Sequence, residues 1–133
     1  MSTRSRIAVM HGDVCKSVYC HYDGYPEYTG RLLLDNYGSN EANDLVSRGD
    51  VSQVKPTVGE MKFYDQVSDE RNWHAAGTFD DFLDQVDGCC AEWYYVMRDG
   101  KWYVGNLYEQ DARHYRQLVP LRESLAALAA VPA

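Results

Sequence analysis

Two pairs of short runs rich in β-branched and aromatic residues lie far apart in the chain. The first pair flanks the dipeptide Gly12-Asp13 and the second flanks Asp99-Gly100. A short turn-forming pair between two β-prone runs is typical of a tight hairpin. The pattern therefore predicts β-hairpins at about residues 6–21 and 92–105. The runs at 50–54 and 60–67 are expected to be single strands, and residues 68–77 a polar loop.

Helical spacing of apolar residues, at intervals of three and four, predicts helices elsewhere. We expect four of them, near residues 26–37, 40–48, 79–87 and 120–130. Proline stands in the first turn of the first and last, where its missing N–H costs nothing. Ser39 or Asn40 is suited to cap the second helix, and Thr78 the third.

Hairpins and helices in this order predict the α+β class. The helices are too irregularly placed for a doubly wound parallel sheet. We expect a single domain over residues 1–133, with an antiparallel or mixed sheet built from the two hairpins and one or two single strands. The helices are expected to cover one face of that sheet.

Composition and charge narrow the class of function. Hydrophobic residues make up 45% of the chain, a globular composition without a run long enough to cross a bilayer. The net charge is −7, and residues 35–92 carry thirteen acidic side chains against four basic ones. We therefore expect no direct binding to nucleic-acid phosphates and no membrane association, but a partner with a basic surface. The N-terminus lacks an apolar signal-peptide core, so we expect a cytoplasmic protein without disulfides.

The segment "YCHYDGYPEYTG" at residues 19–30 is the most unusual in the chain. We predict a rigid corner from strand to helix, in which Gly24 supplies the special backbone conformation and Pro26 starts the helix. Cys20 and Tyr28 would anchor the corner to the core. Tyrosine offers a large contact area at a low cost in side-chain entropy. The predicted partner-binding residues here are Tyr22, Asp23, Tyr25 and Glu27. The alternative interpretation is that Tyr22 and Tyr25 only cover the edge of the hydrophobic core.

The helix at 79–87 has an apolar face and an acidic face. The acidic residues are Asp80, Asp81, Asp84 and Asp87. They form either a solvated face or a second docking surface for a basic partner.

Metal and catalytic chemistry find little support in the sequence. Cys15 and Cys20 alternate to opposite faces of one strand, and Cys89 and Cys90 follow the end of a helix, where the dipole disfavours a thiolate. No phosphate-binding, zinc-protease or hydrolase motif is present. We predict no catalytic residue, no metal ligand and no cofactor, and keep a structural zinc site as an alternative.

The first alternative, ahead of the zinc site, is a small-molecule binder that sequesters a nucleotide. The side chains that could stack on a base are Tyr22, Tyr25, Trp73, Trp93 and Trp102, and the nearest cations for a phosphate are Arg4, Arg6 and Arg31.

Three motifs within residues 4–54 carry a resemblance to a known family. They are S-R-I at Ser5–Ile7, Y-C-H-Y-D-G-Y-P at Tyr19–Pro26 and L-V-S-R-G-D-V-S at Leu45–Ser52, the last with one extra spacing residue. In this combination the chain resembles a widespread family of short, mostly uncharacterised tailed-phage and prophage proteins. The resemblance implies a phage origin, and small acidic phage proteins without catalytic motifs often act by binding. The expected function is thus inhibition of a host protein of the bacterial defence machinery, in the manner of an anti-CRISPR protein.

Overall fold

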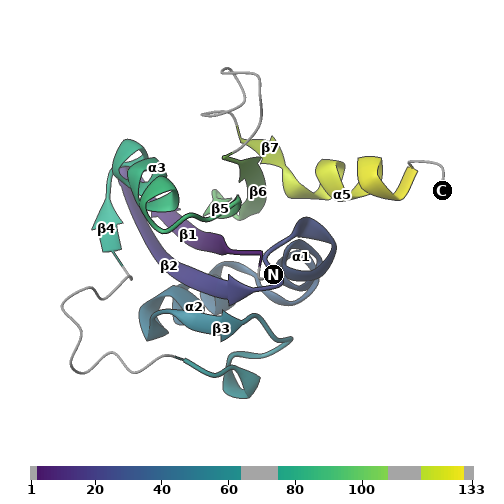
Figure 1. Ribbon diagram of the computed structural model, residues 1–133, viewed down its shortest axis with the longest axis horizontal. Helices are drawn as coiled ribbons and strands as arrows, with labels where there is room; N and C mark the ends of the chain where they lie inside the picture. The colour runs from purple at the N-terminus through teal and green to yellow at the C-terminus, as the bar shows by residue number, and fades with distance from the viewer. Residues whose placement is uncertain (1–2, 64–74, 108–117, 131–133) are drawn as a thin grey trace.

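The computed structural model describes residues 3–63, 75–107 and 118–130, drawn as ribbons in Figure 1. The strands are β1 (Ser5–His11), β2 (Val14–Tyr22), β3 (Val51–Gln53), β4 (Ala75–Gly77), β5 (Trp93–Arg98), β6 (Lys101–Asn106) and β7 (Val119–Pro120). The helices are α1 (Arg31–Asn36), α2 (Ser39–Arg48), α3 (Phe79–Gly88) and α5 (Leu121–Ala130). A π-helical turn, η1 (Pro26–Gly30), leads into α1, and a 3-10 turn, η2 (Val58–Glu60), follows β3.

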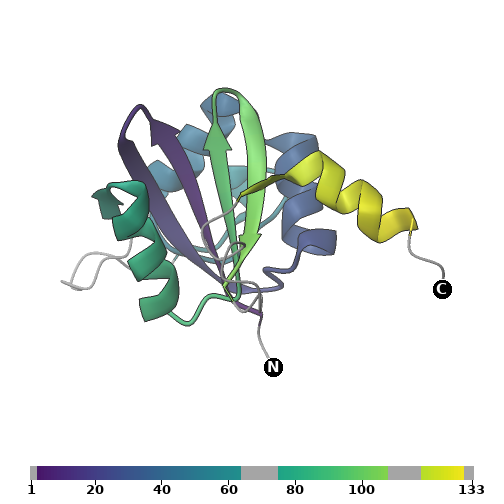
Figure 2. The ribbon, with the colours of Figure 1, turned by 90° about the horizontal axis from the view of Figure 1, so that it is seen from above.

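The strands form one mixed sheet in the order β3-β2-β1-β5-β6-β7, and β4 also pairs with β2. The hairpins β1–β2 and β5–β6 are antiparallel, whereas β1 pairs with β5, and β2 with β3, in parallel. Figure 2 shows the two hairpins side by side at the centre. This arrangement confirms the predicted α+β class and both hairpins.

Helices cover both faces of the sheet, so the expectation that they cover one face is wrong. One core lies under α1, α2 and α5, and a second lies under α3 (Figure 1). The reason is visible in β1, where the neighbouring residues Ile7 and Ala8 point to opposite faces and are both fully buried. The central parallel pair β1–β5 therefore needs cover on each side.

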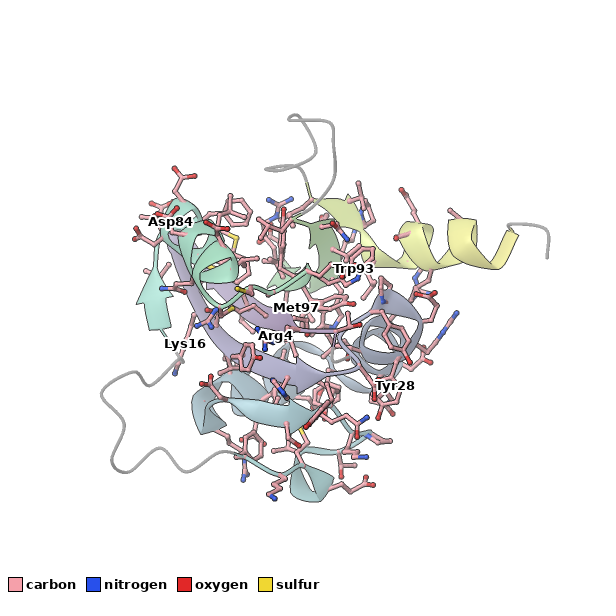
Figure 3. The ribbon with its side chains drawn as sticks, in the orientation of Figure 1. Arg4, Lys16, Tyr28, Asp84, Trp93 and Met97 are labelled. Carbon is pink, nitrogen blue, oxygen red and sulfur yellow. The ribbon has the colours of Figure 1, made fainter. Side chains whose placement is uncertain are left out.

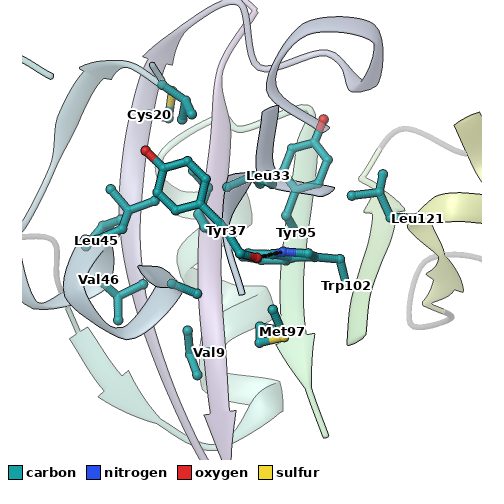
Figure 4. Packing of buried hydrophobic residues seen from close by; sticks show 14 of the residues in the cluster. Val9, Cys20, Leu33, Tyr37, Leu45, Val46, Tyr95, Met97, Trp102 and Leu121 are labelled. Atoms are coloured by element: carbon teal, nitrogen blue, oxygen red, sulfur yellow. Dashed lines mark hydrogen bonds between the residues drawn. The ribbon is translucent and has the colours of Figure 1, made fainter. Parts of the chain in front are cut away.

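The larger core is fixed by hydrogen bonds as well as by packing (Figure 4). Trp102 donates from Nε1 to the Tyr37 carbonyl oxygen over 2.8 Å, and the Tyr37 hydroxyl donates to the Lys55 carbonyl oxygen over 2.7 Å. These bonds tie the β5–β6 hairpin to the junction between α1 and α2, and that junction to the loop after β3.

Several boundaries differ from those predicted. Ala75–Gly77, expected in a loop, form β4 because they pair in antiparallel with residues 15–17 in the first half of β2. Helix α2 is capped by Gly38, whose N–H donates to the Glu41 side chain over 2.9 Å, and not by Ser39 or Asn40. Of the strand predicted at 60–67, Glu60 lies in η2 and Phe63 makes one bridge to Val51, whereas residues 64–67 lie outside the described residues.

Candidate recognition surface

The backbone turns a corner between β2 and η1, and this corner needs Gly24 for a different reason from the one predicted. The residue in the left-handed region is Asp23, at φ 54°, and Gly24 is not. Gly24 is required because its backbone lies against the N-terminus of β1. An added Cβ would lie 2.6 Å from Ser5 Cβ and 2.9 Å from the Thr3 carbonyl oxygen. Aspartate tolerates the left-handed conformation better than most residues, which makes Asp23-Gly24 a workable pair.

Hydrogen bonds from distant parts of the chain hold this corner. The Gly24 N–H donates to the Thr3 carbonyl oxygen over 2.8 Å, and the Gly24 carbonyl oxygen accepts from the Tyr95 hydroxyl over 2.6 Å. The Thr29 hydroxyl donates to the Asp23 carbonyl oxygen over 2.6 Å, and Gln53 Nε2 donates to the Asp23 carboxylate. Burial raises the pKa of the Tyr95 hydroxyl well above its ordinary value, so it remains a donor.

The anchoring side chains predicted for the corner are found in place. Cys20 is fully buried in the larger core. Tyr28, labelled in Figure 3, is half-buried and donates its hydroxyl to the Val54 carbonyl oxygen over 2.9 Å. Pro26 stands at the first position of η1.

Two tyrosines project from this fixed backbone. Tyr22 is 49% exposed and Tyr25 is 37% exposed. Among the described residues, they are the two aromatic side chains in the set of exposed large hydrophobic residues. The Tyr22 ring meets His21 edge-on at 4.5 Å between centroids, and the His21 ring is held by a 2.7 Å hydrogen bond between its Nδ1 and the Tyr19 hydroxyl. Glu27, two residues after Tyr25 in the sequence, is exposed, whereas the Asp23 side chain is half-buried. We call Tyr22, Asp23, Tyr25 and Glu27 the tyrosine corner.

The four aspartates of α3 are all exposed, but they lie elsewhere. Helix α3 packs on the opposite face of the sheet, against the first half of β2, and Figure 3 shows Asp84 and Tyr28 at opposite sides of the molecule. Asp81 has a structural role: its carboxylate accepts from the Thr78 N–H over 3.0 Å, and its own N–H donates to the Thr78 hydroxyl over 3.1 Å. This capping box confirms Thr78 as the N-cap. The two predicted halves of the binding surface are therefore two separate surfaces.

The cysteines of β2 point into different cores, as the strand pattern predicts. Cys15 is buried beneath α3 and Cys20 beneath the opposite helices. Burial raises the pKa of the Cys15 thiol to about 12 and that of Cys20 to about 11. Among the described residues, no group of three or more His, Cys, Asp or Glu side chains is arranged to hold a metal ion.

A groove of about 750 Å³ was missed by the sequence reasoning. It lies between the α1–α2 junction, the tip of the β5–β6 hairpin and the start of α5, and its lining includes Tyr37, Lys101, Trp102, Tyr103 and Arg122. Of the side chains proposed to stack on a base, only Trp102 is among those lining it, and Trp73 lies outside the described residues. Because three remote segments form the groove, no local motif could have marked it.

Comparison with protein-family models, with curated proteins and with solved structures finds no match to this chain. The described residues contain no helix that is long and apolar enough to span a bilayer.

Proposed function

We propose that this protein binds and inhibits a host protein, and that the tyrosine corner is its contact surface. The observation that carries the proposal is the pair of exposed rings, Tyr22 and Tyr25, on a backbone fixed by bonds to Thr3, Thr29 and Tyr95. A surface that is rigid before binding loses little conformational entropy on binding. Tyrosines held in this way are typical of the few residues that dominate the free energy of a protein–protein contact.

The class of partner follows from charge and from the motifs in residues 4–54. The chain has a net charge of −7, and Glu27, two residues after Tyr25, adds an exposed carboxylate. A complementary partner is basic, as are proteins that hold nucleic acid. Together with the resemblance to phage proteins, this supports a target in the bacterial defence machinery, such as a CRISPR effector, and thus action in the host cytoplasm.

The test is affinity purification of the tagged protein from a bacterial host, with bound proteins identified by mass spectrometry. The wild type is compared with Tyr22→Ala/Tyr25→Ala and with Val14→Ala. Val14 is a matched control because it is also 49% exposed and lies at the other end of β2. We expect a stoichiometric basic partner with the wild type and with Val14→Ala, and its loss with the double variant. Equal recovery with all three proteins would exclude the tyrosine corner as the contact.

The groove favours a second candidate function, the binding of a small molecule. Its volume of about 750 Å³ is within the range of ligand pockets, and it combines aromatic side chains with the cations Lys101 and Arg122. Calorimetry against a panel of cyclic and linear dinucleotides tests this candidate. Binding that is weakened by Arg122→Ala would support it, and a silent panel would remove nucleotide sequestration.

A further inference from the structure

The groove between the α1–α2 junction, the β5–β6 hairpin tip and the start of α5 carries charges of both signs on different walls. The α1–α2 wall presents two carboxylates, Asp35 and Glu41. The wall formed by the hairpin tip and α5 presents two cations, Lys101 and Arg122. All four side chains are exposed, and none of them forms an ion pair with the residues that the structure describes. The two walls therefore keep their charges available to a ligand.

One further carboxylate, Glu123, lines the groove on the α5 side. It directly follows Arg122 on the helix, and residues one position apart on a helix do not face each other. Glu123 also makes no ion pair with a described residue. The α5 side thus retains two cations against one carboxylate, and the α1–α2 wall has carboxylates alone.

The acidic wall is positioned by the junction between the two helices. Glu41 Oε1 accepts from the Gly38 N–H over 2.9 Å, which holds this carboxylate at the groove. Asp35 is the last residue but one of α1, where a carboxylate meets the negative end of the helix dipole. No described residue supplies a counter-ion to Asp35. A cation bound at this wall would relieve that unfavourable position.

The buried part of the groove lining is apolar and aromatic. Met97 and Trp102 are paired across the β5–β6 hairpin, and Figure 4 shows both in the same part of the core as Tyr37. The polar atoms of the two aromatic side chains are already bonded, Trp102 Nε1 to the Tyr37 carbonyl oxygen and the Tyr37 hydroxyl to the Lys55 carbonyl oxygen. These residues therefore offer a ligand apolar surface and no further hydrogen bond.

This distribution of charge discriminates between classes of ligand. A dinucleotide brings phosphates and no cation at neutral pH, so Asp35 and Glu41 would repel it. A ligand with a cation alone would leave Lys101 and Arg122 unmatched. A short peptide with free ends has an ammonium group, an apolar middle and a carboxylate. The volume of about 750 Å³ is within the range of pockets for ligands of this size.

We propose that the groove binds a short zwitterionic peptide, of about two or three residues. The ammonium group of the peptide pairs with Asp35 and Glu41. Its carboxylate pairs with Lys101 and Arg122, and its apolar side chains lie on the buried aromatic surface. This inference rests on the second candidate function, small-molecule binding in the groove, and names the ligand class. It does not involve the tyrosine corner.

The test is titration calorimetry of the native protein with tripeptides that have alanine at both ends and leucine, phenylalanine or tyrosine in the middle. Each is used with free ends, with an acetylated N-terminus and with an amidated C-terminus. We expect a free form to bind with a dissociation constant below about 1 mM. Each blocked form should bind about fivefold more weakly, because it has lost one exposed ion pair. Equal affinity for the three forms would overturn the proposal.

Charge variants test each wall against one end of the peptide. Asp35→Asn should weaken binding of the free peptide about threefold and should not weaken binding of the acetylated form. Arg122→Gln should weaken binding of the free peptide to a similar extent and should not weaken binding of the amidated form. An equal loss for free and amidated peptides in Arg122→Gln would overturn its pairing with the carboxylate, because it would show a structural effect.

Two controls and a second ligand class complete the experiment. Arg31→Gln and Asp84→Asn change exposed charges that do not line the groove, so all affinities should stay those of the wild type. Thermal melts should show every variant folded. Linear and cyclic dinucleotides are titrated in parallel. If a dinucleotide binds and is weakened by Arg122→Gln while all peptides are silent, the peptide class is wrong and small-molecule binding stands. Silence of both classes would remove the two together.

Discussion

The tyrosine corner and helix α3 both present carboxylates to solvent, but the structure holds them in different ways. The corner is tied by hydrogen bonds to Thr3, Gln53 and Tyr95, residues from three distant parts of the chain. Helix α3 displays its aspartates through one local capping box and an apolar face against the sheet. A fixed corner is suited to short-range contact that depends on shape. A solvated row of charges acts at longer range and on many partners alike. For the binding function proposed above, the difference favours the corner as the source of specificity and limits α3 to electrostatic steering.

The largest effect is expected from Gly24→Ala, which breaks the corner at its backbone. The new Cβ would lie 2.9 Å from the Thr3 carbonyl oxygen, a backbone atom that cannot rotate away, so β1 or the corner must shift. We expect the free energy of unfolding to fall by about 3 kcal/mol, the upper part of the usual range for overpacking. Partner binding should weaken as well, because the rings on either side are displaced.

Chemical denaturation of Gly24→Ala beside Gly59→Ala measures this effect. Gly59 is the matched control, since nothing lies within 4 Å of a Cβ added there and its φ is not positive. We expect a near-neutral result for Gly59→Ala. A Gly24→Ala protein as stable as the wild type would show that the corner is pliable.

The next largest effect is a loss of folding stability at alkaline pH, caused by the buried thiol of Cys20 in the corner. Burial raises its pKa to about 11, from an ordinary value of 9.0. Below pH 9 the thiol is protonated in both the folded and the unfolded states, so its contribution to stability is complete. Above pH 9 the unfolded state loses the proton first, and stability falls as the pH rises toward 11. This one group accounts for a loss of about 1.4 kcal/mol at pH 10.

Cys20→Ala should remove that part of the alkaline loss, at a cost of roughly 1–2 kcal/mol at neutral pH as a buried large-to-small change. Cys15→Ala extends the comparison to the α3 side, because burial raises the pKa of Cys15 in the same direction. Denaturation at pH 7 and at pH 10 measures both. A pH slope unchanged in Cys20→Ala would mean that the thiol is not protonated in the folded state at pH 10.

The sequence predicted most where the signal is local. The hairpin at Asp99-Gly100, the cap at Thr78 and the first position of η1 at Pro26 depend on residues a few positions apart, and all three are found. The α+β class follows from the order of such elements. Long-range pairing was not predictable in this way. The strand β4 exists because β2 offers it a partner, and the cover on both faces depends on the parallel pairing of β1 with β5.

In the candidate site, too, local features were predicted from the sequence and long-range contacts were not. The exposure of Tyr22 and Tyr25 was predicted from a crowded aromatic segment that cannot be wholly internal. The reason for Gly24 was wrong, because the constraint comes from Ser5 and Thr3, which are remote in sequence. No spacing in the chain indicates that Tyr95 would bond to the corner, or that Asp35 and Arg122 would line one groove.

A smaller effect is expected from Thr78→Ala, which removes the N-terminal cap of α3 and leaves the tyrosine corner unchanged. The Thr78 hydroxyl accepts from the Asp81 N–H over 3.1 Å at the start of the helix. Loss of such a cap costs about 1 kcal/mol. Thr78→Ser keeps the hydroxyl and should stay within a few tenths of the wild type. Thermal melts give the stability, and binding per folded molecule should be unchanged in both variants if the corner alone makes the contact.

The smallest effect is expected from Asp84→Asn/Asp87→Asn. This double variant tests whether the acidic face of α3 contributes to partner binding. Both residues are exposed, and neither makes a hydrogen bond or an ion pair with the described residues. Asp87 lies in the last turn of α3, where a carboxylate meets the negative end of the helix dipole, so its removal should stabilise the fold slightly, by up to about 0.5 kcal/mol. With a basic partner, the association rate should fall about two- to threefold at low salt and not at high salt, because distant charges are then screened. The dissociation rate should be that of the wild type, and surface-immobilised kinetics at two ionic strengths resolve both quantities. If the double variant instead dissociates faster, α3 touches the partner directly, and the contact surface extends to both faces of the sheet.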